Sequence, residues 1–186
     1  MSTSNHFINE SLLLEECLAN NRIAQKELYD RYSGKMYAVC LRYCSDIDQA
    51  KDLLQEGFIK IFRSLDSFRS EGSFEGWVRR IFVTTCIGHT KKKQYLAEID
   101  ETTNNSVEDI EMNGFEKLSL KDLHDMIQAL SDGYRTVFNL YAVEGYSHKE
   151  ISDMLNISIG TSKSQYARAK QTLQQNLEKR RDKSFV

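Results

Sequence analysis

The apolar residues of this chain recur at steps of three and four, which is the spacing of one face of an α-helix. The clearest example runs from residue 50 to residue 65, where charged and amide side chains fill the intervening positions. Its apolar positions are Ala50, Leu53, Leu54, Phe58, Ile61, Phe62 and Leu65. Residues 24–44 repeat the pattern, and a third such segment follows Ser73, which we expect to cap it. Three amphipathic helices with short connections predict a bundle that can bury a core.

The helical pattern stops between residues 97 and 114, a stretch that is acidic and rich in asparagine and threonine, and it resumes from about 115 to 177. A composition shift of this kind is typical of a linker between domains. We therefore predict an all-α protein of two small helical domains, residues 10–95 and 117–180, joined by a flexible acidic linker at 96–116.

Composition supports the all-helical interpretation and leaves the partners open. The 186 residues include nine glycines and no proline, and helices are the elements that need proline least. The formal net charge is −2, but residues 94–116 hold seven carboxylates and no basic side chain, so the rest of the chain is positive. This segregation of charge keeps nucleic-acid binding open as a function.

The start of the chain does not have the pattern of a signal peptide. Residues 1–21 lack a basic segment followed by a long apolar run, and no later stretch is apolar enough to cross a bilayer. We expect a cytoplasmic protein that is not inserted in a membrane. Its cysteines are then expected to be reduced thiols; they are Cys17, Cys40, Cys44 and Cys86.

The segment from Ser147 to residue 177 carries the signals of a helix-turn-helix. Ser147 and Glu150 have the spacing of a capping box. Asn156 tolerates the left-handed conformation that a tight turn demands. Ile157 can fill the angle between two helices, and Ser158 can cap the second one. A short capped helix, a tight turn and a longer second helix together predict this motif.

The second helix of this motif begins with a series of polar and basic side chains. They are Thr161, Lys163, Ser164, Gln165, Arg168 and Lys170. In recognition helices such residues contact base edges and phosphates in the major groove. A solvated polar face on an ordinary helical hairpin would give a similar pattern, so these residues alone leave both interpretations open.

Longer motifs in both halves resemble one family. In the C-terminal half they are Gly133–Phe138, Glu144–Ile151, Ile157–Ser158 and Gly160–Ser164. In the N-terminal half they are Leu28–Tyr32, Asp52–Lys60, Asp66–Arg69 and Trp77–Ile81. In this order and spacing, over about residues 13–177, they resemble regions 4 and 2 of extracytoplasmic-function (ECF) RNA polymerase sigma factors, in particular the Bacteroidetes-type members. The resemblance implies an alternative sigma factor, not an enzyme, that binds core RNA polymerase and directs promoter recognition, DNA melting and transcription initiation.

The resemblance also implies roles for residues of the N-terminal half. The helix that in the family docks on the clamp helices of the largest polymerase subunit carries Asp52, Gln55, Glu56, Phe58 and Ile59. The loop from Ser67 to Ser73 resembles the specificity loop that captures a flipped base of the minus-10 element, with Phe68, Arg69 and Ser70 as candidate contacts. The basic residues expected on the melted strand and its phosphates are Arg79, Arg80, Lys91 and Lys92.

For the C-terminal half, the family's minus-35 contacts correspond to Lys163, Ser164 and Arg168, with Thr161 on a phosphate. The flap of the second-largest polymerase subunit is the other partner implied there, and an anti-sigma factor is implied as a regulator. One departure from the family is Ser162, which stands where valine is usual. No cofactor is expected.

Two other classes of protein deserve comparison. A DNA-binding activator or repressor could carry a similar helix-turn-helix, but the N-terminal half lacks the alternating strands and helices of a sensor or receiver domain. A zinc or redox protein could use Cys40, Cys44, Cys86 and His89, although free cysteines on apolar faces are more often core residues. The chain contains no recognised catalytic motif, and its four histidines are dispersed.

Overall fold

The computed structural model describes residues 9–44, 46–97 and 120–183, without the side chains of 91–97, 120–121 and 180–183. Every regular element in these residues is helical and none is a strand, which confirms the prediction of an all-α protein.

Two compact units make up the described chain. The first covers the described residues up to 41 and from 46 to 86, and the second covers residues 42–44 and those after 86. The expected acidic linker lies outside the described residues, except for its first two positions, which end a helix.

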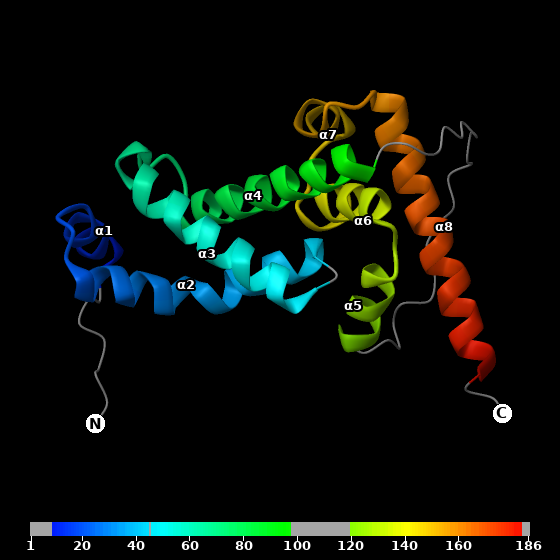
Figure 1. Cartoon of the computed structure of the whole chain (residues 1–186), viewed down its shortest axis with the longest axis horizontal. Coiled ribbons are helices and arrows are strands. Elements are labelled where there is room, and N and C mark those ends of the chain that lie inside the picture. Colours follow the sequence, from blue (N-terminus) through cyan, green and yellow to red (C-terminus); the bar gives the residue numbers. More distant parts are fainter. Residues whose placement is uncertain (1–8, 45, 98–119, 184–186) are drawn as a thin grey trace. The chain divides into compact units, whose positions relative to one another are not determined.

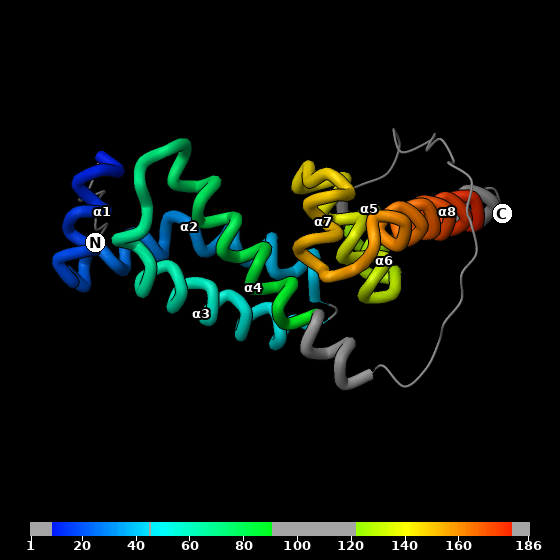
Figure 2. The backbone as a smooth tube through the Cα atoms, turned by 90° about the horizontal axis from the view of Figure 1, so that it is seen from above, coloured from blue at the N-terminus to red at the C-terminus, as the bar shows by residue number. Residues whose placement is uncertain are grey.

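The first unit is built on three helices that lie side by side: α2 (Arg22–Tyr43), α3 (Ile47–Ser64) and the first part of α4 (Phe74–Ala97) (Figures 1 and 2). The apolar positions predicted from the sequence turn inward because they share one helical face. Buried residues from these helices include Leu28, Tyr32, Met36, Leu53, Ile61, Phe74, Val78 and Phe82. Two shorter helices complete the unit, α1 (Glu10–Leu18) and the 3-10 helix η1 (Leu65–Ser67), which contact each other.

Gly57 of α3 lies directly against the ring of Phe82 on α4. A Cβ atom at this position would lie 2.2 Å from Cε1 and 2.5 Å from Cζ of Phe82. The ring of Phe82 is fully buried and also packs edge-on against Phe58, with the ring centroids 5.4 Å apart. The absence of a side chain at Gly57 therefore sets the distance between the two helices.

Besides the last part of α4, the second unit contains α5 (Leu120–Gln128), α6 (Asp132–Phe138), the π-helix η3 (Asn139–Val143), α7 (His148–Leu155) and the long α8 (Ile159–Lys183). Helix α8 packs against both α6 and α7 (Figure 1). The buried core of the second unit contains Met126, Ile127, Leu130, Phe138, Ala169, Leu173 and Leu177.

A buried cation closes the end of α5. The guanidinium of Arg135 donates to the carbonyl oxygens of Gln128 at 3.0 Å and Leu130 at 3.1 Å, and it pairs with the carboxylate of Asp132. The last carbonyls of a helix have no partner within the helix itself. Arg135 supplies the missing donors, which explains why an arginine that is almost completely buried is stable at this position.

All four cysteines are buried. Among the described residues, no group of three or more histidine, cysteine or acidic side chains could hold a metal ion. The core interpretation of the cysteines accounts for their burial without a metal. None of the helices in the described parts of the chain combines the length and apolarity that a bilayer crossing requires.

Candidate nucleic-acid and polymerase interfaces

The first helix of the predicted helix-turn-helix begins at a complete capping box. The amide of Glu150 donates to Oγ of Ser147 at 3.3 Å, and the amide of Ser147 donates to Oε2 of Glu150 at 2.8 Å. The helix ends at Asn156, whose φ of 57° lies in the left-handed region. The prediction of a capped α7 with a left-handed asparagine after it is therefore confirmed.

The second helix begins where the sequence predicts. The amide of Thr161 donates to Oγ of Ser158 at 2.9 Å, so Ser158 caps α8 as expected. Ile157, between the two caps, is half-buried. The two helices of the motif are thus fixed by local hydrogen bonds at both ends of a turn of a few residues.

The candidate base-contacting residues of α8 form two stripes. Thr161, Ser164, Gln165 and Arg168 recur at steps of three and four, so they share one face of the helix. Lys163 and Lys170 are seven residues apart and share a second face. Lys163 is exposed, whereas the residues of the first stripe are half-buried. The helix therefore presents a polar surface with cations on both stripes.

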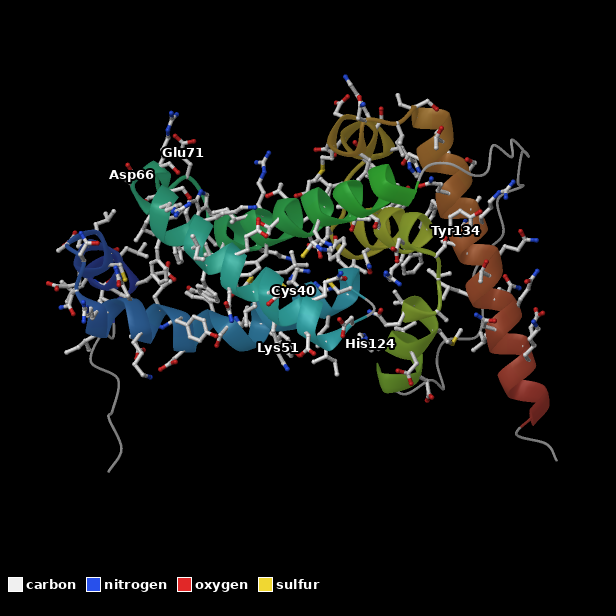
Figure 3. All side chains as sticks on the ribbon, viewed as in Figure 1. Cys40, Lys51, Asp66, Glu71, His124 and Tyr134 are labelled. Carbon is white, nitrogen blue, oxygen red and sulfur yellow. The ribbon has the colours of Figure 1, made fainter. Side chains whose placement is uncertain are left out.

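Several of these side chains have partners in the free protein. Nη1 of Arg168 lies 3.4 Å from the hydroxyl of Tyr134, a residue that lies against α8 in Figure 3. Nζ of Lys170 lies 5.2 Å from the centre of the Tyr166 ring. The hydroxyl of Ser164 donates to the carbonyl of Thr161 at 3.0 Å. Both cations are thus held beside aromatic side chains that limit their conformations.

Sequence reasoning missed an aromatic cluster behind the helix-turn-helix. The imidazole of His148 stacks on Tyr141 with the ring centroids 4.3 Å apart, and Tyr141 packs on Tyr166 at 4.5 Å. Nδ1 of His148 lies 2.9 Å from Oγ of the buried Ser162. The hydroxyl of Ser162 thus gives α7 and α8 a polar contact that the usual valine could not make. No local sequence pattern predicts this aromatic cluster, because its members come from η3, α7 and α8.

The candidate polymerase contacts on α3 separate into a surface and a residue behind it. Asp52, Gln55, Glu56 and Ile59 are all exposed and lie at steps of three and four, so they form one face. Ile59 keeps 50% of its surface exposed, whereas Phe58 keeps 4%. Phe58 is part of the core, where its ring lies 4.5 Å from that of Tyr29. It supports this face from inside.

The loop after η1 turns at two residues with left-handed backbone conformation. Gly72 has a φ of 100° and Ser70 a φ of 57°, both left-handed. Arg69 and Ser70 are exposed, and so are Asp66 and Glu71 at the same end of the unit (Figure 3). The loop ends at Ser73, whose Oγ accepts from the amide of Gly76 at 3.1 Å, which confirms the predicted cap of α4.

Three aromatic rings anchor the loop to α4. The ring of Phe68 lies 5.1 Å from Phe74 and 5.5 Å from Trp77, and the Phe74 and Trp77 rings stack at 5.5 Å. Trp77 is half-buried in this cluster. One turn along α4, Arg79 is half-buried and Arg80 is exposed. The side chains of Lys91 and Lys92 lie outside the described residues.

A bundle bearing an exposed polar helix face, followed in the chain by a capped helix-turn-helix, is the arrangement of sigma-70 type proteins. The family model described as "Sigma-70 region 2" matches residues 28–95, and the model described as "Sigma-70, region 4" matches residues 120–173. Each model coincides with one of the two halves in which the candidate contacts lie.

Known proteins narrow the class further. The chain is 31% identical over 163 residues to the ECF RNA polymerase sigma factor SigW of Bacillus subtilis, which covers 81% of this chain and 87% of the relative. It is 27% identical over 180 residues to the RNA polymerase sigma-H factor of Pseudomonas aeruginosa, covering 89% and 92% respectively. The sigma factor RpoE from Bartonella quintana, solved with the anti-sigma factor NepR, matches with a TM-score of 0.52 and 25% identity over 82% of this chain and 96% of that one.

The chain therefore belongs to the ECF RNA polymerase sigma factors. Members of this family bind core RNA polymerase and promoter DNA, and this protein acts in promoter recognition and transcription initiation. The function expected from the sequence is confirmed.

Proposed function

We propose that the two helical domains of this sigma factor, residues 10–95 and 117–180, divide promoter recognition between them. The first docks on core polymerase and opens the minus-10 element, and the second reads the minus-35 element. The observation that carries this proposal is the pair of separate polar helix faces, one on α3 and one on α8, each held by a buried core. The acidic linker at 96–116 joins the two activities.

The α3 face suits a protein partner. Asp52, Gln55 and Glu56 share one helix face with the exposed side chain of Ile59, and protein interfaces usually combine apolar and polar side chains in this way. We assign this face to the clamp helices of the largest polymerase subunit. Phe58 acts indirectly, because it holds the face in place from the core.

The loop that follows η1 suits single-stranded DNA. Reading an extruded base requires a shaped pocket with polar groups and an aromatic wall. Phe68 provides a ring, Ser70 provides a hydroxyl, and exposed Arg69 provides a cation for the backbone. Arg79 and Arg80, with Lys91 and Lys92 further along α4, are the cations we assign to the melted strand and its phosphates.

Helix α8 suits the major groove. Arginine or lysine to guanine is the commonest specific base contact. Lys163 and Arg168 lie in the N-terminal half of α8, which follows the turn capped by Ser158. Ser164 and Gln165 add donors and acceptors between them. Thr161 and Lys170 are assigned to phosphates. The same domain is assigned the contact with the flap of the second-largest subunit.

Four broader assignments accompany this proposal. The solved relative from Bartonella quintana was crystallised with an anti-sigma factor, and we propose that such a protein also restrains this one. The protein acts in the cytoplasm, where polymerase and promoters are found, and the polymerase performs the chemistry, so the chain is no enzyme. Kinship with the Bacteroidetes-type members is part of the same proposal.

Run-off transcription with purified core polymerase, on fragments of the source genome, tests the proposal. Arg168→Ala is expected to lower promoter-specific transcription about tenfold, because one good base contact contributes about 1–3 kcal/mol of discrimination. Its affinity for core polymerase should not change. The double variant Gln55→Ala with Glu56→Ala should instead weaken binding to core polymerase. Lys179→Ala, an exposed cation at the far end of α8, serves as the matched control. Equal loss of both activities in either variant would contradict the division of labour.

A further inference from the structure

A cavity of about 330 Å³ lies between α1 and the loop that follows η1. Helix α1 lines one side of the cavity with a single face. The lining residues on this side are Glu10, Ser11, Leu14, Glu15 and Leu18. The opposite side consists of Leu65, Phe68, Ser70 and Gly72. The candidate specificity loop thus forms only half of a pocket, and α1 supplies the other half.

The lining combines apolar and acidic side chains. Leu14, Leu18 and Leu65 provide apolar surface, and Phe68 provides a ring that is fixed against Phe74. The carboxylates of Glu10 and Glu15 are the charged groups of the lining. A flat aromatic ligand with hydrogen-bond donors on its edge satisfies both features, because its faces are apolar and its donors can reach a carboxylate.

One of the two carboxylates is held in a fixed position. The hydroxyl of Tyr32 donates to Oε2 of Glu10 at 2.7 Å. Tyr32 is buried, and burial together with this hydrogen bond holds the pKa of its phenol well above the usual range. The phenol therefore remains a donor at every physiological pH. Oε1 of Glu10 receives no hydrogen bond from the residues that the structure describes, so it is the acceptor available to a ligand.

We propose that this cavity receives the extruded base of the minus-10 element and that Glu10 selects a base with an exocyclic amino group, namely cytosine, adenine or guanine, over thymine. The inference rests on the proposed function of the loop and adds α1 to the reading site. Cytosine N4, adenine N6 and guanine N2 each carry an N–H₂ donor, whereas thymine has carbonyl oxygens and no amino group. A carboxylate attracts the first group and repels the second. Glu10 is the specificity-determining residue, and Tyr32 is a positioning residue.

The charges around the cavity also determine which part of the nucleotide enters it. Two carboxylates disfavour a phosphate inside, so the backbone must remain at the rim. Arg69 is exposed and lies in the loop between two lining residues, Phe68 and Ser70, without lining the cavity itself. It is therefore suited to the phosphate of the extruded nucleotide.

The test uses holoenzyme assembled from the full chain and core polymerase. A promoter found by run-off transcription is randomised at each minus-10 position of the non-template strand in turn, and transcripts are counted by sequencing. The variants are Glu10→Gln and Tyr32→Phe. Glu16→Gln is the matched control, because Glu16 lies on the same helix, does not line the cavity and accepts a hydrogen bond from Asn21 at 2.8 Å.

The wild-type protein should prefer the three bases with an exocyclic amino group over thymine at one minus-10 position. Glu10→Gln should reduce that preference about tenfold, as expected for a hydrogen bond to a charged group. Tyr32→Phe should reduce it in part, at the same position only, which a general loss of stability would not do. Glu16→Gln should match the wild type.

Two results would overturn the inference. Only the second would also contradict the proposed function of the loop. If Phe68→Leu altered the minus-10 preference while Glu10→Gln left it unchanged, α1 would have no part in reading, although the role of the loop would stand. If the wild-type chain directed no specific transcripts, or if Phe68→Leu also left the minus-10 preference unchanged, the proposed function of the loop would fail together with the inference.

Discussion

Replacing Gly57 with alanine adds one methyl group where α3 meets the ring of Phe82, and we expect the first unit to lose stability. The added carbon would lie 2.2, 2.5 and 2.7 Å from three ring carbons, whereas carbon atoms in contact are normally about 3.5–4.0 Å apart. Relief therefore requires a shift of about 1 Å. Because the ring is fully buried and packed against Phe58, it cannot swing into solvent.

Two opposing effects determine the free energy of unfolding of this variant. Alanine is favoured over glycine inside a helix by about 1 kcal/mol. Overpacking a close-packed core costs about 1–3 kcal/mol, and the severity of this overlap puts the cost in the upper part of that range. The net expectation is a destabilisation of about 1–2 kcal/mol.

Urea unfolding followed by tryptophan fluorescence measures the effect, because Trp77 is the only tryptophan and lies in the first unit. Gly34→Ala is the matched control: it is the same substitution in a helix of the same unit, with nothing within 4 Å of the added carbon. It should raise the urea midpoint by the propensity effect alone. Adding Phe82→Leu to Gly57→Ala should recover part of the loss. A rise in midpoint for Gly57→Ala similar to that of Gly34→Ala would refute the packing argument.

Three further changes should act through named contacts. Ser147→Ala removes the capping box of α7 and should destabilise it by about 1 kcal/mol, seen as faster hydrogen exchange in that helix; unchanged exchange would contradict the role of the cap. Arg135→Met leaves the carbonyls of Gln128 and Leu130 without their donors and should cost about 3 kcal/mol, with exchange at the end of α5 as the readout. Burial raises the pKa of the Cys17 thiol from 9.0 to about 11, so its stabilising effect is complete below pH 9.0 and is lost as the pH rises through about 11. Urea midpoints across that interval should fall less steeply for Cys17→Ala than for the wild type, and parallel curves would contradict the assignment.

The parts of the structure that could be predicted are those set by neighbours in the sequence. The caps at Ser73, Ser147 and Ser158 and the left-handed turn at Asn156 depend on hydrogen bonds or dihedral angles within three or four residues. Side-chain type and spacing therefore suffice to identify them. The inward faces of α2, α3 and α4 followed from periodicity for the same reason.

Contacts between helices could not be predicted in the same way. The stack of His148 on Tyr141, the approach of Gly57 to Phe82 and the cavity beneath α1 each join residues from different helices. Their existence depends on the packing angle and offset of those helices, which no short pattern encodes. Phe58 had two interpretations from the sequence, as part of the apolar stripe and as a candidate polymerase contact, and the structure shows that it is buried.

The shape of the loop after η1 has a thermodynamic consequence for the strand capture that we propose for it. Its backbone is already turned at Ser70 and Gly72, and Phe68 is already packed against Phe74 and Trp77. Fixing one residue of a flexible segment costs about 1–2 kcal/mol of conformational entropy. Since folding has met that cost before any promoter arrives, association with the strand loses little chain entropy, and the contacts to the base are expressed almost fully as affinity. In the role that we propose for it, the loop would select a promoter through direct contacts with the base, with little reordering of its own chain.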